Sequence, residues 1–311
     1  MEIRPLSGGT GAEITGVSLA DGVGDDELST IVAALYERLV VCIRGQRLSP
    51  AGLAAFARRL GTPIVHVERD ILVEDVPEVM TLSNADGRPE RQRNGGYHWH
   101  TDLVFTDDPV SFTMLNAVAV PRSGGETGFA NQYAALDALP ASLRKQAEAA
   151  TVRHCYEGRR DGSFPTVRHP LVRAHPATGR PALYGATSAC IGVEGMDEDE
   201  GRAFLDEIGR YAIAPEVQYS HAYEVDDVVI WDNAATLHTG PKLDEASGPG
   251  DARIMNRVSV RGWPQAQASY GCSSVPGISA RSPTQGWAER VQIWPDGRSW
   301  SRCLSAPRRR P

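Results

Sequence analysis

The sequence has little cysteine, and the thiols that it has follow no recognisable spacing. The five cysteines are Cys42, Cys155, Cys190, Cys272 and Cys303. An odd, scattered set without a C-x-x-C pair is not the pattern of a disulfide framework or of a cysteine-based zinc site. We therefore expect reduced thiols and a cytoplasmic protein.

Long hydrophobic runs and an excess of positive charge are also missing. The longest apolar run, Leu39 to Ile43, is far too short to span a bilayer, and the first residues show no signal-peptide pattern. The chain has 32 Lys and Arg against 39 Asp and Glu, a net charge of −7. Such a chain lacks the positive field that attracts phosphate backbones or anionic membranes. We expect no membrane and no nucleic-acid partner, and the sequence leaves a homo-oligomer open.

The chain contains the material for one β-rich domain with flanking helices. Capping residues and apolar periodicity predict helices at 25–39, at 49–60 and from Asp197 onward. Strand-like runs occupy 40–43, 111–120, 181–184, 228–231 and 253–260, and the turn residues at 176–180 indicate a hairpin. This pattern favours a double-sheet jelly roll, that is, a double-stranded β-helix, over a βαβ repeat.

The composition changes near Trp263. We expect a catalytic domain over residues 1–262 and a C-terminal extension over 263–311, which is rich in Ser, Gly, Pro and Arg. Four of the six tryptophans lie in this extension, so part of it should pack on the domain while its basic end stays mobile. The four are Trp263, Trp287, Trp294 and Trp300.

One set of residues has the chemistry of a metal centre. His100 and Asp102 are two positions apart, so they project to the same side of an extended chain, and His238 follows an apolar strand. Two histidines and one carboxylate make the facial triad of non-haem Fe(II) oxygenases, which leaves coordination positions open. An isolated H-x-D pair is more often a solvated loop or a hydrogen-bonded core pair, so the pair alone does not predict a metal.

The strand at 253–260 adds two arginines. With a period of two, Arg253 and Arg257 share one face of this strand, and guanidinium groups inside a barrel need anions to compensate them. A 2-oxo acid with a distal carboxylate would suit such a fork, because Arg pairs with carboxylates in a bidentate manner. Taken alone, both arginines also fit ordinary surface charges on a strand.

The joint pattern resembles the taurine dioxygenase/TfdA family over about residues 3 to 262. The matching segments are Leu60-Gly61 with His66, Trp99-His100-Thr101-Asp102, Gly124-Gly125-Glu126-Thr127, His169-Pro170-Leu171-Val172-Arg173 with His175-Pro176, Trp231-Asp232-Asn233 with His238, and Arg253-Ile254-Met255-x-Arg257. The resemblance implies a double-stranded β-helix in which His100, Asp102 and His238 bind Fe(II).

The resemblance also implies the co-substrates and the chemistry. 2-Oxoglutarate would chelate the iron, with Arg253 on its distal carboxylate and Thr127 as a supporting donor. O2 would then be used to oxidise an unactivated C–H bond of a small molecule, with release of succinate and CO2. His66 and Arg257 match positions that hold an acidic group of the substrate in taurine dioxygenase.

The substrate pocket departs from that relative at two positions. Gly96 stands where the taurine-specific enzyme has Asn, and Ala189 stands where it has an aromatic residue. Both changes remove side-chain volume, so we expect a larger, more apolar substrate than taurine. One alternative is an acid or lactone of specialised metabolism, such as a terpenoid on the pentalenolactone route to an antibiotic. The other is a sulfonate or aryloxy acid that is broken down in catabolism.

Two readings outside this class remain open from the sequence. A jelly roll does not by itself specify chemistry, so a non-catalytic metal-binding protein is one alternative. A zinc hydrolase is the other, because zinc also accepts two histidines and an aspartate. Oxygen-dependent formation of succinate distinguishes the oxygenase from both.

Overall fold

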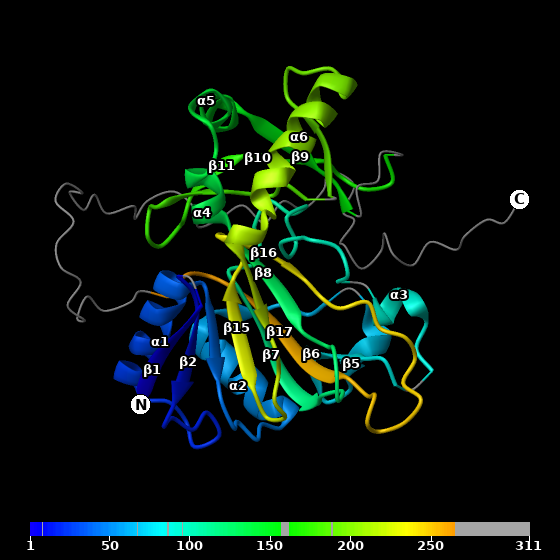
Figure 1. Cartoon of the computed structure of the whole chain (residues 1–311). Coiled ribbons are helices and arrows are strands. Elements are labelled where there is room, and N and C mark those ends of the chain that lie inside the picture. The colour runs from blue at the N-terminus through cyan, green and yellow to red at the C-terminus, as the bar shows by residue number, and fades with distance from the viewer. Residues whose placement is uncertain are drawn as a thin grey trace, which may run out of the picture.

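A computed structural model describes residues 1–7, 9–66, 68–85, 87–94, 96–156, 162–187 and 189–264. Its broadest layer is a nine-stranded sheet (Figure 1), made of β1 (Glu2–Ser7), β2 (Thr10–Thr15), β3 (Val40–Ile43), β4 (Thr62–Pro63), β5 (Leu72–Val73), β6 (Val76–Ser83), β7 (Phe112–Ala119), β15 (Val228–Asp232) and β17 (Ile254–Arg261). The strand order is β1-β2-β3-β15-β7-β17-β6-β5, and β4 also pairs with β17. Only the β2–β3 pairing is parallel among these strands.

Helices cover the outer face of this sheet. They are α1 (Asp25–Arg38) and α2 (Pro50–Leu60). Ser49 caps α2 by accepting a hydrogen bond from the Gly52 amide, and Pro50 occupies the first helical position. Alternate residues of the sheet, such as Met114 and Val258, join the apolar side chains of both helices in one buried cluster. This cluster is the hydrophobic core that fixes the sheet from outside.

A smaller sheet faces the inner side of the large one. It consists of β8 (Thr127–Asn131), β14 (Gln218–His221) and β16 (Thr236–Thr239) in the order β14-β8-β16. A second apolar cluster lies between the two sheets and includes Leu115, Phe129, Trp231 and Met255. Two mainly antiparallel sheets around a common core confirm the predicted jelly roll.

The remaining elements form a separate group at the top of Figure 1. They are α4 (Gln132–Asp137), α5 (Ala141–Ala149), β9 (Thr151–His154), β10 (Val167–Pro170), β11 (Val172–Ala174), β12 (Pro181–Leu183), β13 (Cys190–Val193), α6 (Glu198–Ala212) and the 3-10 turn Pro215–Val217. Two short elements, the 3-10 turn Arg69–Ile71 and α3 (Glu90–Arg93), lie before the first histidine of the predicted triad. The group at the top of Figure 1 has a third apolar cluster, which also includes Ala130 of β8 and Leu237 of β16 and so joins this group to the small sheet.

Most predicted elements agree with the structure. The three predicted helices, the hairpin β11–β12 and the five strand-like runs are present, with ends shifted by one or two residues. Trp263 packs against Tyr36, Phe112 and His175. The division into a domain and an extension stays a prediction. The other three tryptophans and the basic end lie outside the described residues, so the prediction made for them stays a prediction. Within the described residues, no helix is both long enough and apolar enough to cross a bilayer.

Candidate active site

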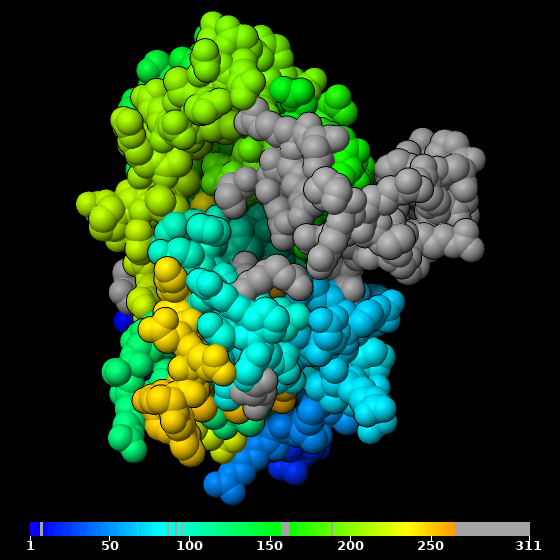
Figure 2. Space-filling view, turned by 90° about the vertical axis from the view of Figure 1, so that its right-hand side faces the viewer, coloured from blue at the N-terminus to red at the C-terminus, as the bar shows by residue number. Residues whose placement is uncertain are grey.

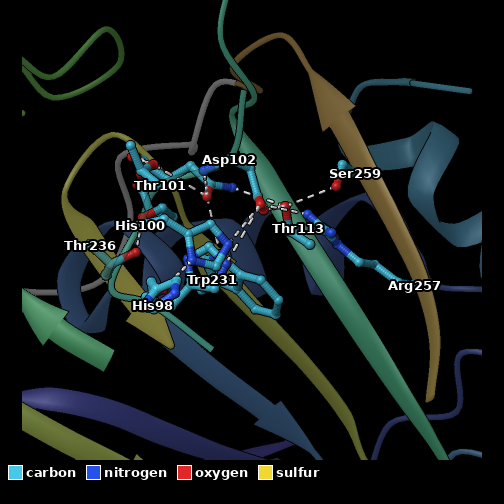
Figure 3. Close-up of polar contacts among 12 residues, drawn as sticks. His98, His100, Thr101, Asp102, Thr113, Trp231, Thr236, Arg257 and Ser259 are labelled. Atoms are coloured by element: carbon cyan, nitrogen blue, oxygen red, sulfur yellow. Dashed lines mark hydrogen bonds and ion pairs between the residues drawn. The ribbon is translucent and has the colours of Figure 1, made fainter. Parts of the chain in front are cut away.

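His100 and His238 are brought together by the backbone itself. They form an isolated antiparallel bridge in which each amide donates to the other residue's carbonyl, at 2.9 and 2.8 Å. The two imidazole centroids are 4.1 Å apart. Asp102 Oδ1 lies 3.6 Å from Nε2 of each ring. Figure 3 shows His100 and Asp102 side by side at this site. Residues far apart in the sequence thus present three ligand atoms within 4.8 Å of one another.

The donor set fits a divalent cation. His100 Nδ1 lies 2.6 Å from the His98 carbonyl, which can only accept, so the Nε2 lone pair of His100 faces Asp102. Burial lowers the pKa of His238 well below its usual value and keeps that ring neutral. Burial would raise the pKa of Asp102, but the charge of Arg257 brings it well below the usual range. A carboxylate and two imidazole lone pairs therefore converge in the protonation states that metal binding requires.

Hydrogen bonds with two polar side chains hold Asp102 in its orientation. Thr113 Oγ1 donates to Asp102 Oδ2 at 2.6 Å and accepts from Asn233 Nδ2 at 3.1 Å. The Asp102 amide donates to Asn233 Oδ1 at 3.3 Å. The second carboxylate oxygen is thereby occupied, which leaves Oδ1 directed toward the histidines. The sequence did not indicate Thr113, because one threonine in an apolar strand carries no signal.

The turn that leads to His238 is fixed by another buried pair. His175 Nε2 lies 2.7 Å from Asp232 Oδ2, and both side chains are fully buried. His175 Nδ1 accepts from two backbone amides, so its proton is on Nε2 and is donated to the carboxylate. Asp232 Oδ1 accepts from the Ala234 amide at 2.8 Å. The segment Asp232–Thr236 is thus held rigidly ahead of the second histidine.

Arg253 is a buried cation whose side chain has no carboxylate partner in the described part of the chain. Its side chain donates to the Gly125 carbonyl at 2.8 Å and to Thr127 Oγ1 at 3.5 Å. Among the described residues, no Asp or Glu carboxylate lies within ion-pair distance of it. Burial lowers the pKa of Arg253, so the desolvated charge is costly until an anion meets it. The environment fits a carboxylate that comes from a ligand.

The observed partner of the Arg257 side chain differs from the one that we expected. We expected a substrate anion to be its available partner, but its Nη2 lies 2.6 Å from Asp102 Oδ1 (Figure 3). The reason is that β17 places Arg257 directly opposite the carboxylate, and the side chain reaches the oxygen that faces the histidines. Arg257 Nε is buried without a hydrogen-bond partner, so the guanidinium still has an unused donor.

All the predicted site residues line one cavity of about 620 Å³. They are His66, Gly96, His100, Asp102, Thr127, Ala189, His238, Arg253 and Arg257. In the space-filling view the surface is hollowed between the cyan segments and the green upper part (Figure 2). Burial and the charge of Arg257 lower the pKa of His66, so this ring is a neutral group on the cavity wall. The structure thus brings together residues that the sequence spreads over 192 positions, from 66 to 257.

A second group of ligand-type side chains lies apart from this cavity. Cys42, His221 and Asp227 approach within the same distance limit as the first triad. Arg44 Nη1 is 2.6 Å from Asp227 Oδ2, and the third member of this group is a thiol instead of a second histidine. Burial raises the pKa of the Cys42 thiol, which disfavours the thiolate that a metal would need. We interpret this group as a buried ion pair.

Comparisons with known proteins agree with this geometry. Residues 2–259 match the model of the family described as "Taurine catabolism dioxygenase TauD, TfdA family". The chain is 33% identical over 265 residues to an alpha-ketoglutarate-dependent 2,4-dichlorophenoxyacetate dioxygenase of Cupriavidus pinatubonensis, covering 78% of this chain and 92% of that protein. It is 28% identical to pentalenolactone F synthase of Streptomyces arenae, over 83% of this chain and 94% of that protein. The solved structure of a taurine dioxygenase from Burkholderia xenovorans superposes with a TM-score of 0.73 at 31% identity, covering 84% and 89% of the two chains.

Proposed function

Because this chain belongs to the TauD/TfdA family of 2-oxoglutarate-dependent dioxygenases, we propose that the cavity around His100, Asp102 and His238 is its catalytic centre. The chain is a non-haem Fe(II) dioxygenase, with Fe(II), 2-oxoglutarate and O2 as cofactor and co-substrates. This confirms the class of enzyme predicted from the sequence. The assignment of individual residues is our proposal. The convergence of three ligand atoms in the cavity that Arg253 also lines supports it most strongly.

In this proposal each residue has a distinct task. His100, Asp102 and His238 hold the iron, and Thr113 keeps the Asp102 carboxylate in its binding orientation. When bound, the iron and the oxo acid together supply the oxidising chemistry, which consumes O2 and releases succinate and CO2. Arg253 supplies the counter-charge for the distal carboxylate of 2-oxoglutarate and thereby fixes the direction in which the oxo acid enters.

The primary substrate is proposed to be a small organic molecule with an acidic or lactone group. Arg257 retains an unused donor, and His66 offers a neutral imidazole on the same cavity wall. The small side chains at Gly96 and Ala189 leave room for a carbon skeleton larger than taurine. The two candidate contexts are specialised metabolism, for which the similarity to pentalenolactone F synthase is the support, and aryloxy-acid or sulfonate catabolism. A cytoplasmic location and a homo-oligomeric state stay predictions.

A substrate screen tests the proposal. O2 consumption is measured with Fe(II) and 2-oxoglutarate in the presence of aryloxy acids, sulfonates and terpenoid lactones, and succinate is quantified against product. We expect one succinate for each substrate oxidised. Hydrolysis of a substrate without O2 uptake would identify a hydrolase instead. Arg257→Ala should weaken binding of the primary substrate more than binding of 2-oxoglutarate, and equal weakening of both would remove Arg257 from the substrate site.

A further inference from the structure

Thr127 has a second neighbour besides Arg253. The hydroxyl oxygens of Tyr223 and Thr127 are 2.9 Å apart. Tyr223 lies just beyond β14, whose last residue His221 pairs with Thr127 across the small sheet. Its side chain is buried, and the His221 ring meets it edge to face with centroids 4.8 Å apart. The position of the phenol is therefore set by packing that does not involve a ligand.

The direction of the hydrogen bond between the two hydroxyls follows from their chemistry. Thr127 Oγ1 is the only hydrogen-bond partner found for Tyr223 OH within the described part of the chain. A buried phenol is a good donor and a weak acceptor, and burial raises the pKa of Tyr223 to about 12, so its proton is retained. Arg253 Nη2 also approaches Thr127 Oγ1 as a donor, at 3.5 Å. With both neighbours donating, the threonine's own proton remains free to be donated elsewhere.

The same ring touches the arginine. Arg253 Cζ lies 5.5 Å from the centroid of the Tyr223 ring, within the range of a cation–π contact. Tyr223 thus contacts both residues that we assign to the distal carboxylate of 2-oxoglutarate. Neither contact involves a residue of the predicted metal triad.

We propose that Tyr223 is a positioning residue for 2-oxoglutarate. Its hydroxyl donates to Thr127 Oγ1 and so turns the Thr127 proton toward the distal carboxylate, while its ring steadies the Arg253 guanidinium. The inference rests on the proposed binding of 2-oxoglutarate by Arg253 and Thr127. Tyr223 acts through these two residues and needs no contact with the reacting atoms.

Binding of 2-oxoglutarate to the full chain tests this inference. Isothermal titration calorimetry is done on protein loaded with Mn(II), which accepts similar ligands, in the absence of O2 so that nothing turns over. Tyr223→Phe keeps the ring and removes only the hydroxyl, and we expect Kd to rise about two- to tenfold. Steady-state kinetics should show a raised KM for 2-oxoglutarate with kcat nearly unchanged at saturation. The matched control is Tyr36→Phe, whose hydroxyl donates to the Pro264 carbonyl beside the outer apolar cluster and should leave Kd unchanged.

A double-mutant cycle tests whether Tyr223 acts through Thr127. In a Thr127→Val background, which keeps the shape and lacks the hydroxyl, Tyr223→Phe should weaken binding much less than it does in the native chain. An unchanged Kd for Tyr223→Phe, or fully additive losses in the double variant, would overturn the inference. Arg253→Met distinguishes a failure of the proposed 2-oxoglutarate site from a failure of the role proposed for Tyr223. If it leaves Kd unchanged, the proposed 2-oxoglutarate site is wrong; if it alone weakens binding, only the role of Tyr223 is wrong.

Discussion

The two faces of the large sheet show how one strand performs two tasks. On β7, Met114 points outward into the apolar cluster with the helices, and its neighbour Thr113 points inward to Asp102. On β17, Val258 packs outward and Arg257 reaches inward to the same carboxylate. The alternation of a β-strand sends successive residues to opposite environments. The outer face is desolvated and apolar, and the inner face beside the cavity carries polar and charged groups.

The two faces of the sheet affect stability in opposite ways. A buried apolar residue on the outer face gains stability from its removal from water, whatever the ligand. A buried cation on the inner face costs free energy until a partner neutralises it, as Arg253 illustrates. Substitutions should therefore divide by face, with outer-face changes lowering stability and inner-face changes lowering binding or turnover.

Loss of a metal ligand should have the largest effect. We expect His100→Ala, Asp102→Ala and His238→Ala each to abolish turnover, because each removes one of three protein ligands at an open-sided site. O2 consumption and anaerobic Fe(II) titration measure activity and metal retention. Val258→Ala on the outer face is the control and should keep activity while folded. Full activity in any of the three ligand variants would refute the triad.

Removal of Arg253 should come next. Arg253→Ala should raise the KM for 2-oxoglutarate strongly, since a desolvated charge-assisted pair is typically worth about 2–5 kcal/mol. Thr127→Ala should do less, because a neutral hydroxyl contributes only about 0.5–1.5 kcal/mol. Steady-state kinetics with varied 2-oxoglutarate measures both. If the Arg253 variant kept its KM, the carboxylate site would have to lie elsewhere, with Arg257 as the next candidate.

Two adjacent residues of β7, one on each face, test whether inner-face and outer-face substitutions have different effects. Thr113→Val keeps the shape but removes the hydrogen bond to Asp102, so we expect metal affinity to fall about 10- to 100-fold. Met114→Ala should lower the free energy of unfolding by about 2–5 kcal/mol through cavity formation, with metal affinity unchanged. Chemical denaturation and metal titration are made on both variants. If both variants lost metal affinity and stability to the same extent, the two faces would not differ in function.

The sequence predicted the helices and strands better than the contacts between residues that are far apart in the chain. Capping residues and apolar periodicity marked helices such as Pro50–Leu60, since these signals are local. The triad was predicted because the spacing of His100 and Asp102 and the resemblance pointed to the same residues. The contact of His175 with Asp232 joins residues 57 apart, and that of Thr127 with Tyr223 joins residues 96 apart. Such contacts arise only when distant segments pack together in the fold, so no local sequence pattern predicts them.

The smallest and most selective effect should come from filling the cavity at Ala189. This residue and Gly96 line the same hollow as the triad, and Ala189 is only partly buried there. Ala189→Phe adds a ring to the wall, so it should exclude bulky substrates by steric overlap and spare small ones. Val118→Phe is the control, because it adds the same ring at an exposed position of β7 that does not line the cavity. It should change neither selectivity nor folding.

Thermal unfolding of the Ala189→Phe protein shows whether residue 189 faces the cavity or the hydrophobic core. If Ala189 faced the core, the added ring would lower the melting temperature, as an overpacked outer-face residue would, and every substrate would lose activity alike. If it faces the cavity, the melting temperature should hold while KM rises for large substrates only. A stable Ala189→Phe protein that oxidised a bulky substrate at the native rate would show that this wall does not select the substrate, and the space left by the small residues would then need another occupant.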